Sequence, residues 1–164
     1  MTYFADLTPY TYWSRVADVA GDDPDDGLGR LLNVGWLAAG ESFPTGASPP
    51  GLVDNLLRRA TRPVHVTRGV HLCEFCENPI RGAPLRLDGK LVHAGNAEIH
   101  VTGADNTVYA APTLIAHYVA EHHYLPPAQF IDAALHGPEA ADVVDMTLAG
   151  ADARPRTRRW WQRR

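Results

Sequence analysis

Two cysteines and two histidines form the part of this sequence best suited to chemistry. Cys73 and Cys76 have the spacing C-x2-C, and His117 and His122 follow after forty intervening residues with the spacing H-x4-H. A lone C-x2-C pair indicates metal binding or redox chemistry rather than a disulfide framework. Redox pairs of this kind stand at the start of a helix, whereas proline and glycine closely follow this pair. We therefore expect a metal site.

Zinc is the metal that this donor set favours. Two thiolates and two imidazoles make a closed tetrahedral set, and x4 lies within the spacing of structural zinc sites. On an ideal helix, five residues turn through roughly 500°, so His117 and His122 would point roughly 140° apart. The two imidazoles therefore converge only if the last helical turn loosens. We predict Zn²⁺ held by Cys73, Cys76, His117 and His122.

Two further histidines are alternatives at this site. His71 stands two residues before Cys73, and on a strand it would point the same way. It is therefore a candidate fourth ligand or a residue that contacts a ligand. His123 is an alternative to His122. The remaining histidines are expected at exposed or hairpin positions (His93 and His100) and on the ordinary surface (His65 and His136).

The same site has a structural and a catalytic interpretation. Four protein ligands leave no open position, which favours a structural role. If one histidine is not a ligand, a zinc-bound water with a pKa near 7 would be the nucleophile. Glu98 is then the preferred acid or base, with Glu121 and His123 as alternatives. The sequence has no H-E-x-x-H, zinc-deaminase, G-x-S-x-G or phosphate-loop signature. Whether the protein is an enzyme stays open.

The elements that position these residues predict an α+β fold. A knuckle at the cysteines, a β-hairpin and then a helix carrying the remaining ligands is the order of a treble-clef zinc finger. The apolar segment 28–37 fits either a helix or a strand. The aromatic segment 1–13 is expected to pack on the body. Hydrophobic spacing and turn residues predict strands near 64–72, 85–87, 91–93, 98–102 and 107–110, and helices near 50–59, 112–122, 128–135 and 139–148.

Length and charge indicate one domain with a distinct tail. The 164 residues are 45% hydrophobic and 21% charged, which is typical of a soluble globular protein. We expect one zinc-binding domain over residues 1–150 and a basic tail over 151–164. No apolar run reaches the roughly 18 residues of a membrane span, and no secretory signal is visible at the start. A cytoplasmic protein is therefore expected.

The charge distribution bears on the partners. The net charge of −4 divides into six arginines in the last eleven residues and a body, residues 1–153, that carries −10. An acidic body opposes docking to nucleic acid, so only the tail is a candidate for that contact. The tail contains Trp160 and Trp161. We expect it to fold back on the acidic body of the same or a neighbouring chain. The expected partner is thus a small molecule or a protein, and an oligomer stays possible.

Longer motifs carry a resemblance to a family. The segments GVHLCEFC (69–76), EIHV (98–101) and YAAPTLIAHYVAEHHYLPPAQFI (109–131) resemble an uncharacterised family of small bacterial zinc-binding proteins. That family pairs a cysteine knuckle with a helix of the pattern HYxxxH…PPxxFI. The opening YFADLTPY and the segment LNVGWL are also similar to it. The resemblance covers most of residues 1–135 and implies metal ligands at Cys73, Cys76, His117 and His122, but no activity. The single lysine and fourteen arginines, with much alanine and glycine, favour an actinomycete-type genome.

Three functions follow from these observations. The preferred one is a zinc-binding protein whose mainly structural Cys2His2 site serves a ligand- or partner-binding module. The second is a small zinc-dependent enzyme of specialised metabolism that uses a zinc-bound water. The third is a nucleic-acid-binding regulatory protein.

Overall fold

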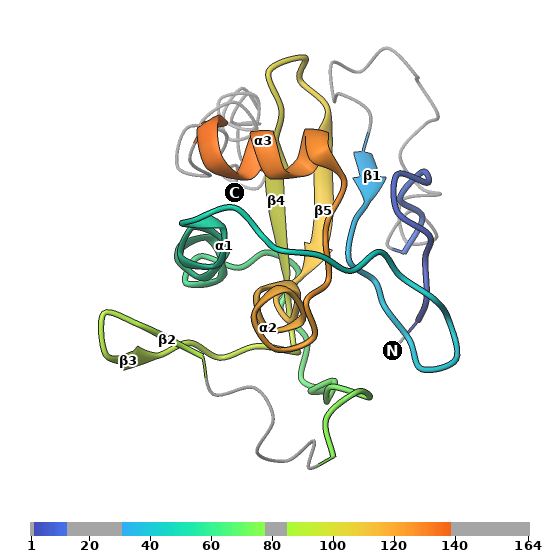
Figure 1. The fold of residues 1–164 in the computed structure, drawn as a ribbon, viewed down its shortest axis with the longest axis vertical. Coiled ribbons are helices and arrows are strands. Elements are labelled where there is room, and N and C mark those ends of the chain that lie inside the picture. The colour runs from blue at the N-terminus through green and yellow to red at the C-terminus, as the bar shows by residue number, and fades with distance from the viewer. Residues whose placement is uncertain (1, 13–30, 78–84, 139–164) are drawn as a thin grey trace, which may run out of the picture.

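A small mixed sheet forms the centre of the protein. The computed structural model describes residues 2–12, 31–77 and 85–138 (Figure 1). β5 (Val108–Pro112) is the middle strand. It pairs antiparallel with β4 (Glu98–Thr102) and parallel with β1 (Leu31–Asn33). The predicted hairpin over residues 98–110 is therefore confirmed, and the ambiguous segment 28–37 contributes a strand.

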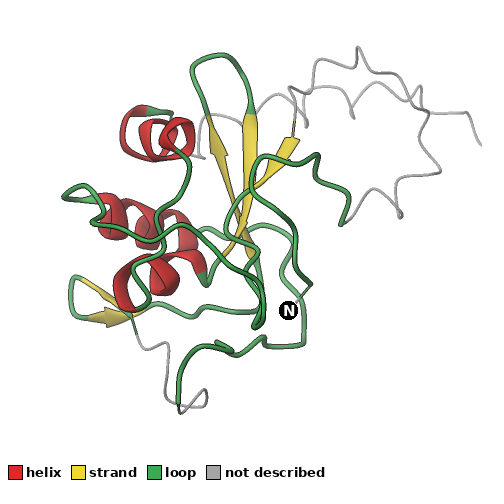
Figure 2. Ribbon diagram, turned by 45° about the vertical axis from the view of Figure 1, so that its right-hand side comes forward, coloured by secondary structure: helices red, strands yellow, loops and turns green. Residues whose placement is uncertain are grey.

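Three helices cover one face of this sheet. They are α1 (Leu52–Ala60), α2 (Ile115–Glu121) and α3 (Ala128–His136), and Figure 2 shows them on the same side of the strands. Successive residues of a strand point to opposite faces, so Ile99 and Val101 join the core beneath the helices. A second sheet of β2 (Arg86–Leu87) and β3 (Lys90–Leu91) lies to one side (Figure 1). The α+β prediction is confirmed, with α1 and α3 where the sequence placed them.

The N-terminal segment covers the opposite face of the sheet. Phe4 and Tyr10 pack around Trp36, with Phe4 and Trp36 ring centroids 5.8 Å apart. Tyr10, Trp36 and Ala110 form a separate buried cluster. The side-chain amide of Asn33 donates hydrogen bonds to the backbone carbonyls of Thr8 and Pro9, which lie 3.2 and 2.9 Å away. Residues 2–12 are thus part of the packed body, as expected.

The predicted strand over residues 64–72 is wrong. Among the described residues of that segment only Val64 forms a β-bridge, opposite Glu98. Val66, Val70 and Leu72 are 62%, 60% and 47% exposed. The alternation of residue types there does not correspond to a buried face, because no neighbouring strand pairs along the described segment. It runs as an irregular connection from α1 to the cysteines.

The helix predicted to begin at Pro112 begins later. Pro112 is the last residue of β5, and Thr113 donates from both its backbone amide and its hydroxyl to the carbonyl of Ala97. Sheet pairing therefore extends through the predicted helix start, and α2 begins at Ile115. The predicted helix over 139–148 and the basic tail over 151–164 lie outside the described residues. Within the described ranges, no helix combines the length and the apolar character needed to cross a bilayer.

Gly35 allows the chain after β1 to pack closely against the start of α2. It has a φ of +73°, and a Cβ there would lie 2.8 Å from Cδ1 of Ile115, at the start of α2. Gly40 also has a positive φ, +93°, but a Cβ there would meet no atom of the described residues within 4 Å. An alanine at either position would therefore cause backbone strain, but only an alanine at Gly35 would also crowd a neighbouring side chain.

We expect Gly35→Ala to lower the free energy of unfolding more than Gly40→Ala. Both variants carry about 1–2 kcal/mol of left-handed strain. Gly35→Ala adds about 1–3 kcal/mol from overpacking against Ile115. Urea unfolding of both variants measures the difference, and Ile115→Val should recover part of the Gly35→Ala loss. Equal losses in the two glycine variants would contradict this packing.

Candidate metal centre

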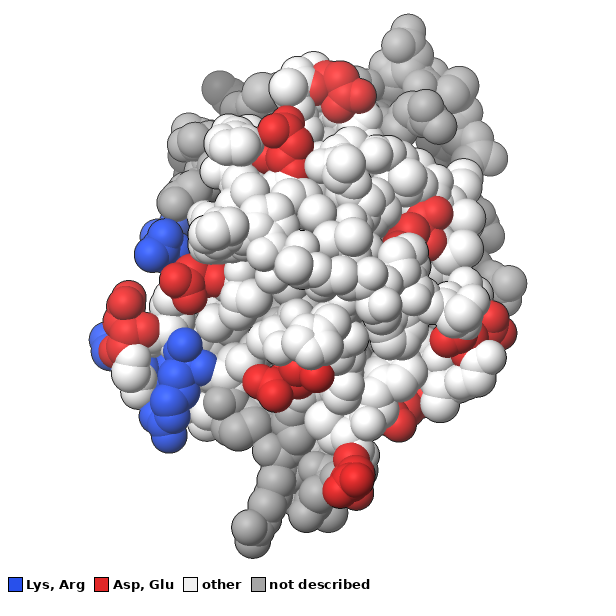
Figure 3. Space-filling view, viewed as in Figure 1, with Lys and Arg blue, Asp and Glu red and all other residues white. Residues whose placement is uncertain are grey.

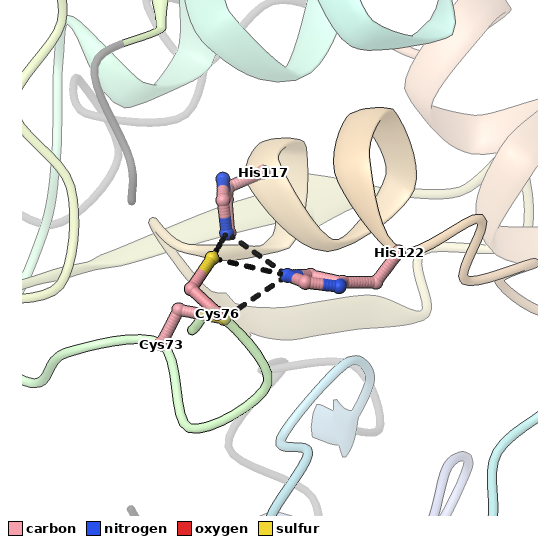
Figure 4. Close-up of side chains that lie close together, drawn as sticks. All are labelled: Cys73, Cys76, His117 and His122. Carbon is pink, nitrogen blue, oxygen red and sulfur yellow. Dashed lines mark hydrogen bonds between the residues drawn. The ribbon is translucent and has the colours of Figure 1, made fainter. Parts of the chain in front are cut away.

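Four donor atoms from two distant segments converge at one point. Cys73 and Cys76 lie on the loop 71–77, His117 lies within α2, and His122 directly follows it (Figure 4). All four ligand atoms, two Sγ and two ring nitrogens, lie within 4.8 Å of one another. The residues that the sequence predicted as metal ligands are therefore together in space.

The spacing of these atoms fits a tetrahedral ion. Nε2 of His122 lies 3.2 Å from Sγ of Cys73, 3.4 Å from Sγ of Cys76 and 3.2 Å from Nε2 of His117. Sγ of Cys76 lies 3.2 Å from Nε2 of His117. Zn–S and Zn–N bonds of ordinary length make tetrahedral edges of about 3.5 Å between sulfur and nitrogen and about 3.3 Å between nitrogens. Small adjustments of the side chains therefore suffice to accommodate zinc.

The end of α2 brings the two histidines to the same side. The helix ends at Glu121, and His122 has left helical geometry with φ −114° and ψ 9°. The imidazole rings of His117 and His122 consequently lie side by side in an edge-to-face arrangement, with centroids 5.0 Å apart and planes at 75°. The loosened last turn that the H-x4-H spacing required is present.

The loop with the cysteines is anchored by its two central residues. The Glu74 carboxylate accepts a hydrogen bond of 2.8 Å from the backbone amide of Ala39. Phe75 packs against the ring of His122, with centroids 5.5 Å apart, and also contacts Tyr118 and Phe43. One side of the cluster is thus formed by aromatic rings that contact the imidazole of His122.

Burial favours the neutral forms of His117, His122 and Cys76. It lowers the pKa of His117 and of His122, and His122 lowers that of His117 further. Burial and the adjacent Cys73 sulfur raise the pKa of Cys76 to about 11. Neutral imidazoles are ready ligands, whereas a thiol must lose its proton to bind metal, so metal uptake would release protons. Nδ1 of His117 is buried without a hydrogen-bond partner among the described residues.

The two alternative histidines lie outside the cluster of four. His71 is exposed, and its backbone amide donates to the carbonyl of Gly95. His123 has a φ of +53°, and its carbonyl accepts a hydrogen bond from Gly46. The structure thus groups His122 rather than His123 or His71 with the cysteines.

Glu98, the preferred acid or base, belongs to a different cluster. Its carboxylate lies 3.1 Å from Nδ1 of His65 and 3.7 Å from Nε2 of His100, and it accepts from the hydroxyl of Tyr10. The sequence predicted His65 on the ordinary surface and His100 at an exposed or hairpin position, and it did not predict this group. Glu98 and His100 share a face of β4 by their i, i+2 spacing, which was the available signal. The sequence pattern carried no signal for the approach of Tyr10 and His65.

Together these features define a small α+β protein with a Cys2His2 cluster able to hold a metal ion. The chain belongs to a family described as a domain of unknown function (DUF7919), whose model matches residues 2–135. This match confirms the resemblance to an uncharacterised family. No curated protein and no solved structure matches the chain.

A buried tyrosine fixes the chain just after His122. Tyr124 is fully buried, and its hydroxyl donates a 2.8 Å hydrogen bond to Oδ2 of Asp6. Oδ1 of Asp6 accepts from the amide of Gly35. Burial raises the pKa of Asp6 above its usual 3.8, although both hydrogen bonds oppose that rise.

We expect Tyr124→Phe to destabilise the protein more at pH 7 than at pH 4. At neutral pH the variant leaves a buried carboxylate with one donor fewer, a loss of about 1.5–3 kcal/mol for a bond to a charged group. The folded-state pKa of Asp6 is raised, so lowering the pH protonates the folded carboxyl before the unfolded one and reduces this penalty. Urea unfolding at both pH values measures the change.

Asp6→Asn supplies the matched control for this pH dependence. In that background residue 6 carries no charge, so Tyr124→Phe should have the same effect at pH 7 and at pH 4. A Tyr124→Phe loss that does not shrink at pH 4 in the otherwise natural chain would contradict the role given to Asp6.

Proposed function

We propose that this protein binds one zinc ion at Cys73, Cys76, His117 and His122, and that this zinc is structural. The observation that carries the proposal is the set of four donor atoms separated by about the edges of a zinc tetrahedron. Two sulfurs and two nitrogens favour zinc over metals that prefer oxygen ligands. Four protein ligands leave no position for a reacting water, which supports a structural role over a catalytic one.

The location of the cluster supports the same role. The segment 64–72 buries little apolar surface, and Cys73 is its first fully buried neighbour, at 1% exposure. An ion shared by the loop 71–77 and α2 would fix that segment to the body. Structural zinc can supply folding free energy on the order of 10 kcal/mol in small domains.

The fixed segment forms part of a cleft, which is our proposed binding module. The cleft is lined by residues from the N-terminal segment, the segment 64–72 and the start of β4, among them Tyr12, Trp36, Thr67, His71, Asn96 and Glu98. His71 is only two residues from Cys73, and its amide donates to Gly95 at 2.6 Å. We propose that zinc at the cysteines holds this wall of the cleft in place for a small-molecule or protein partner.

The nucleic-acid alternative has less support. On the face shown in Figure 3, basic side chains lie near one edge and acidic ones are scattered over the rest. Such a surface offers no continuous basic stripe for a phosphate backbone on that face. Because residues 1–153 carry a net charge of −10, the alternative depends on the basic tail, which lies outside the described residues.

We expect His122→Ala to lose zinc and His123→Ala to retain it. The two histidines are adjacent, but only His122 has its ring nitrogen beside the sulfurs. Zinc per chain, measured by elemental analysis of purified protein, should be close to one equivalent lower in His122→Ala than in His123→Ala. The melting temperature of His122→Ala should also fall well below that of the natural chain.

A chelator distinguishes the structural from the catalytic role. Removing zinc from the natural protein should lower its melting temperature to about that of His122→Ala, because the same link between loop and helix is lost. If both histidine variants keep the same zinc content, the ligand assignment is wrong. If chelation leaves the melting temperature unchanged, the structural role is wrong.

A further inference from the structure

We propose that His65, Glu98 and His100 form a second metal site, open to the cleft, for a divalent first-row transition ion. One ligand atom from each residue lies within 4.8 Å of the other two. Oε2 of Glu98 is central, 3.1 Å from Nδ1 of His65 and 3.7 Å from Nε2 of His100. The rings of the two histidines are 5.4 Å apart at their centroids. This site is distinct from the cysteine cluster in residues and in donor type.

Glu98 is held as a metal ligand would be. The residue is only 3% exposed, and a carboxylate in such a place needs strong partners to remain charged. The hydroxyl of Tyr10 donates to both carboxylate oxygens, at 2.8 and 2.7 Å. Such supporting hydrogen bonds orient ligating carboxylates in metal sites.

His100 has a nitrogen that no described group satisfies. Its Nε2 atom is buried and has no hydrogen-bond partner among the described residues, although the side chain as a whole is 29% exposed. Buried polar atoms are normally paired, so an unpaired ring nitrogen beside a carboxylate calls for a further partner. A metal ion between His100 and Glu98 satisfies it.

His65 is brought to the same place by an unfavourable backbone. Val64 and Glu98 exchange two backbone hydrogen bonds, of 2.9 and 3.0 Å, which fix the chain at that point. The next residue, His65, has a φ of +49°, a left-handed backbone conformation that residues other than glycine rarely adopt. Such strain concentrates at functional sites, where the surrounding structure maintains it.

The donor set defines the class of ion and ligand. Two imidazoles and one carboxylate bind zinc or iron(II) and leave coordination positions open. His65 and Glu98 also line the cleft with Trp36, Thr67 and Asn96. A bound ion would therefore present its open positions to the cleft, where a small molecule with an anionic or oxygen donor would bind it.

Cobalt titration of the full-length protein carrying one equivalent of zinc tests this site. Zinc occupies the sulfur-containing cluster, and added Co²⁺ should then bind at one further equivalent per chain. Its visible spectrum should be that of nitrogen and oxygen ligands, without a thiolate-to-cobalt charge-transfer band. Azide should shift this spectrum, because the ion has open positions.

Three variants and one control locate the bound cobalt. His100→Ala and Glu98→Gln should abolish the cobalt spectrum, and Glu98→Gln keeps an acceptor for Tyr10. Tyr10→Phe should weaken cobalt binding by about ten- to a hundredfold, as expected for the loss of a supporting hydrogen bond. His93→Ala removes an exposed histidine and should leave binding unchanged. Circular dichroism and the unchanged zinc equivalent verify that each variant remains folded.

Several results would overturn the proposal. They are the absence of a second metal equivalent in the natural chain, equal cobalt binding in the natural chain and His100→Ala, or a thiolate band showing that cobalt sits at the cysteines. A cobalt spectrum that azide leaves unchanged would overturn the open positions. Because the thiolate band reports the first cluster separately, failure of the first zinc site is distinguishable from failure of this one.

Discussion

The convergence of two sulfurs and two imidazoles brings the cysteine loop to the end of α2, and we propose that the position of this loop depends on it. These four groups come from the loop 71–77, from α2 and from the residue directly after α2, and β2 to β5 lie between the two regions in the chain. Much of the segment before the cysteines is exposed, so apolar burial contributes little to its attachment. We propose that a shared metal ion fixes the cysteine end of this segment to α2, in addition to its backbone hydrogen bonds with residues 95–98.

That link reaches further than the four ligands. The segment 64–76 is held at one end by the bridge between Val64 and Glu98 and at the other by the cysteines. It carries His65 and His71 between these anchors, and both line the cleft. The geometry of the cleft and the proposed second metal site therefore depend on both ends of one segment. We propose that the Cys2His2 cluster maintains the fold and that the cluster of His65, Glu98 and His100 binds the ligand.

Local patterns predicted the elements whose residues interact mainly within one segment. The apolar spacing in residues 52–59 and 128–135, and the turn over 103–106, correspond to α1, α3 and the hairpin of β4 and β5. The four clustered cysteine and histidine residues were also predictable, because their spacing is characteristic of metal sites. The H-x4-H spacing even required the irregular end of α2 that the structure has.

Long-range pairing explains what the sequence did not reveal. The segment 64–72 alternates like a strand but pairs at Val64 only, and Pro112 was assigned to a helix although it pairs with Glu98 in the sheet. The cluster around Glu98 combines residues from three regions, at Tyr10, His65 and His100. Only the i, i+2 relation of Glu98 and His100 lies within one element.

X-ray absorption at the zinc edge of the protein with one bound equivalent identifies the atoms that hold the metal. If Cys73, Cys76, His117 and His122 bind the ion, the spectrum shows two sulfur neighbours at about 2.3 Å and two nitrogen neighbours at about 2.0 Å. A zinc ion surrounded by nitrogen and oxygen alone would contradict this ligand set, because the cysteines would then not hold the metal.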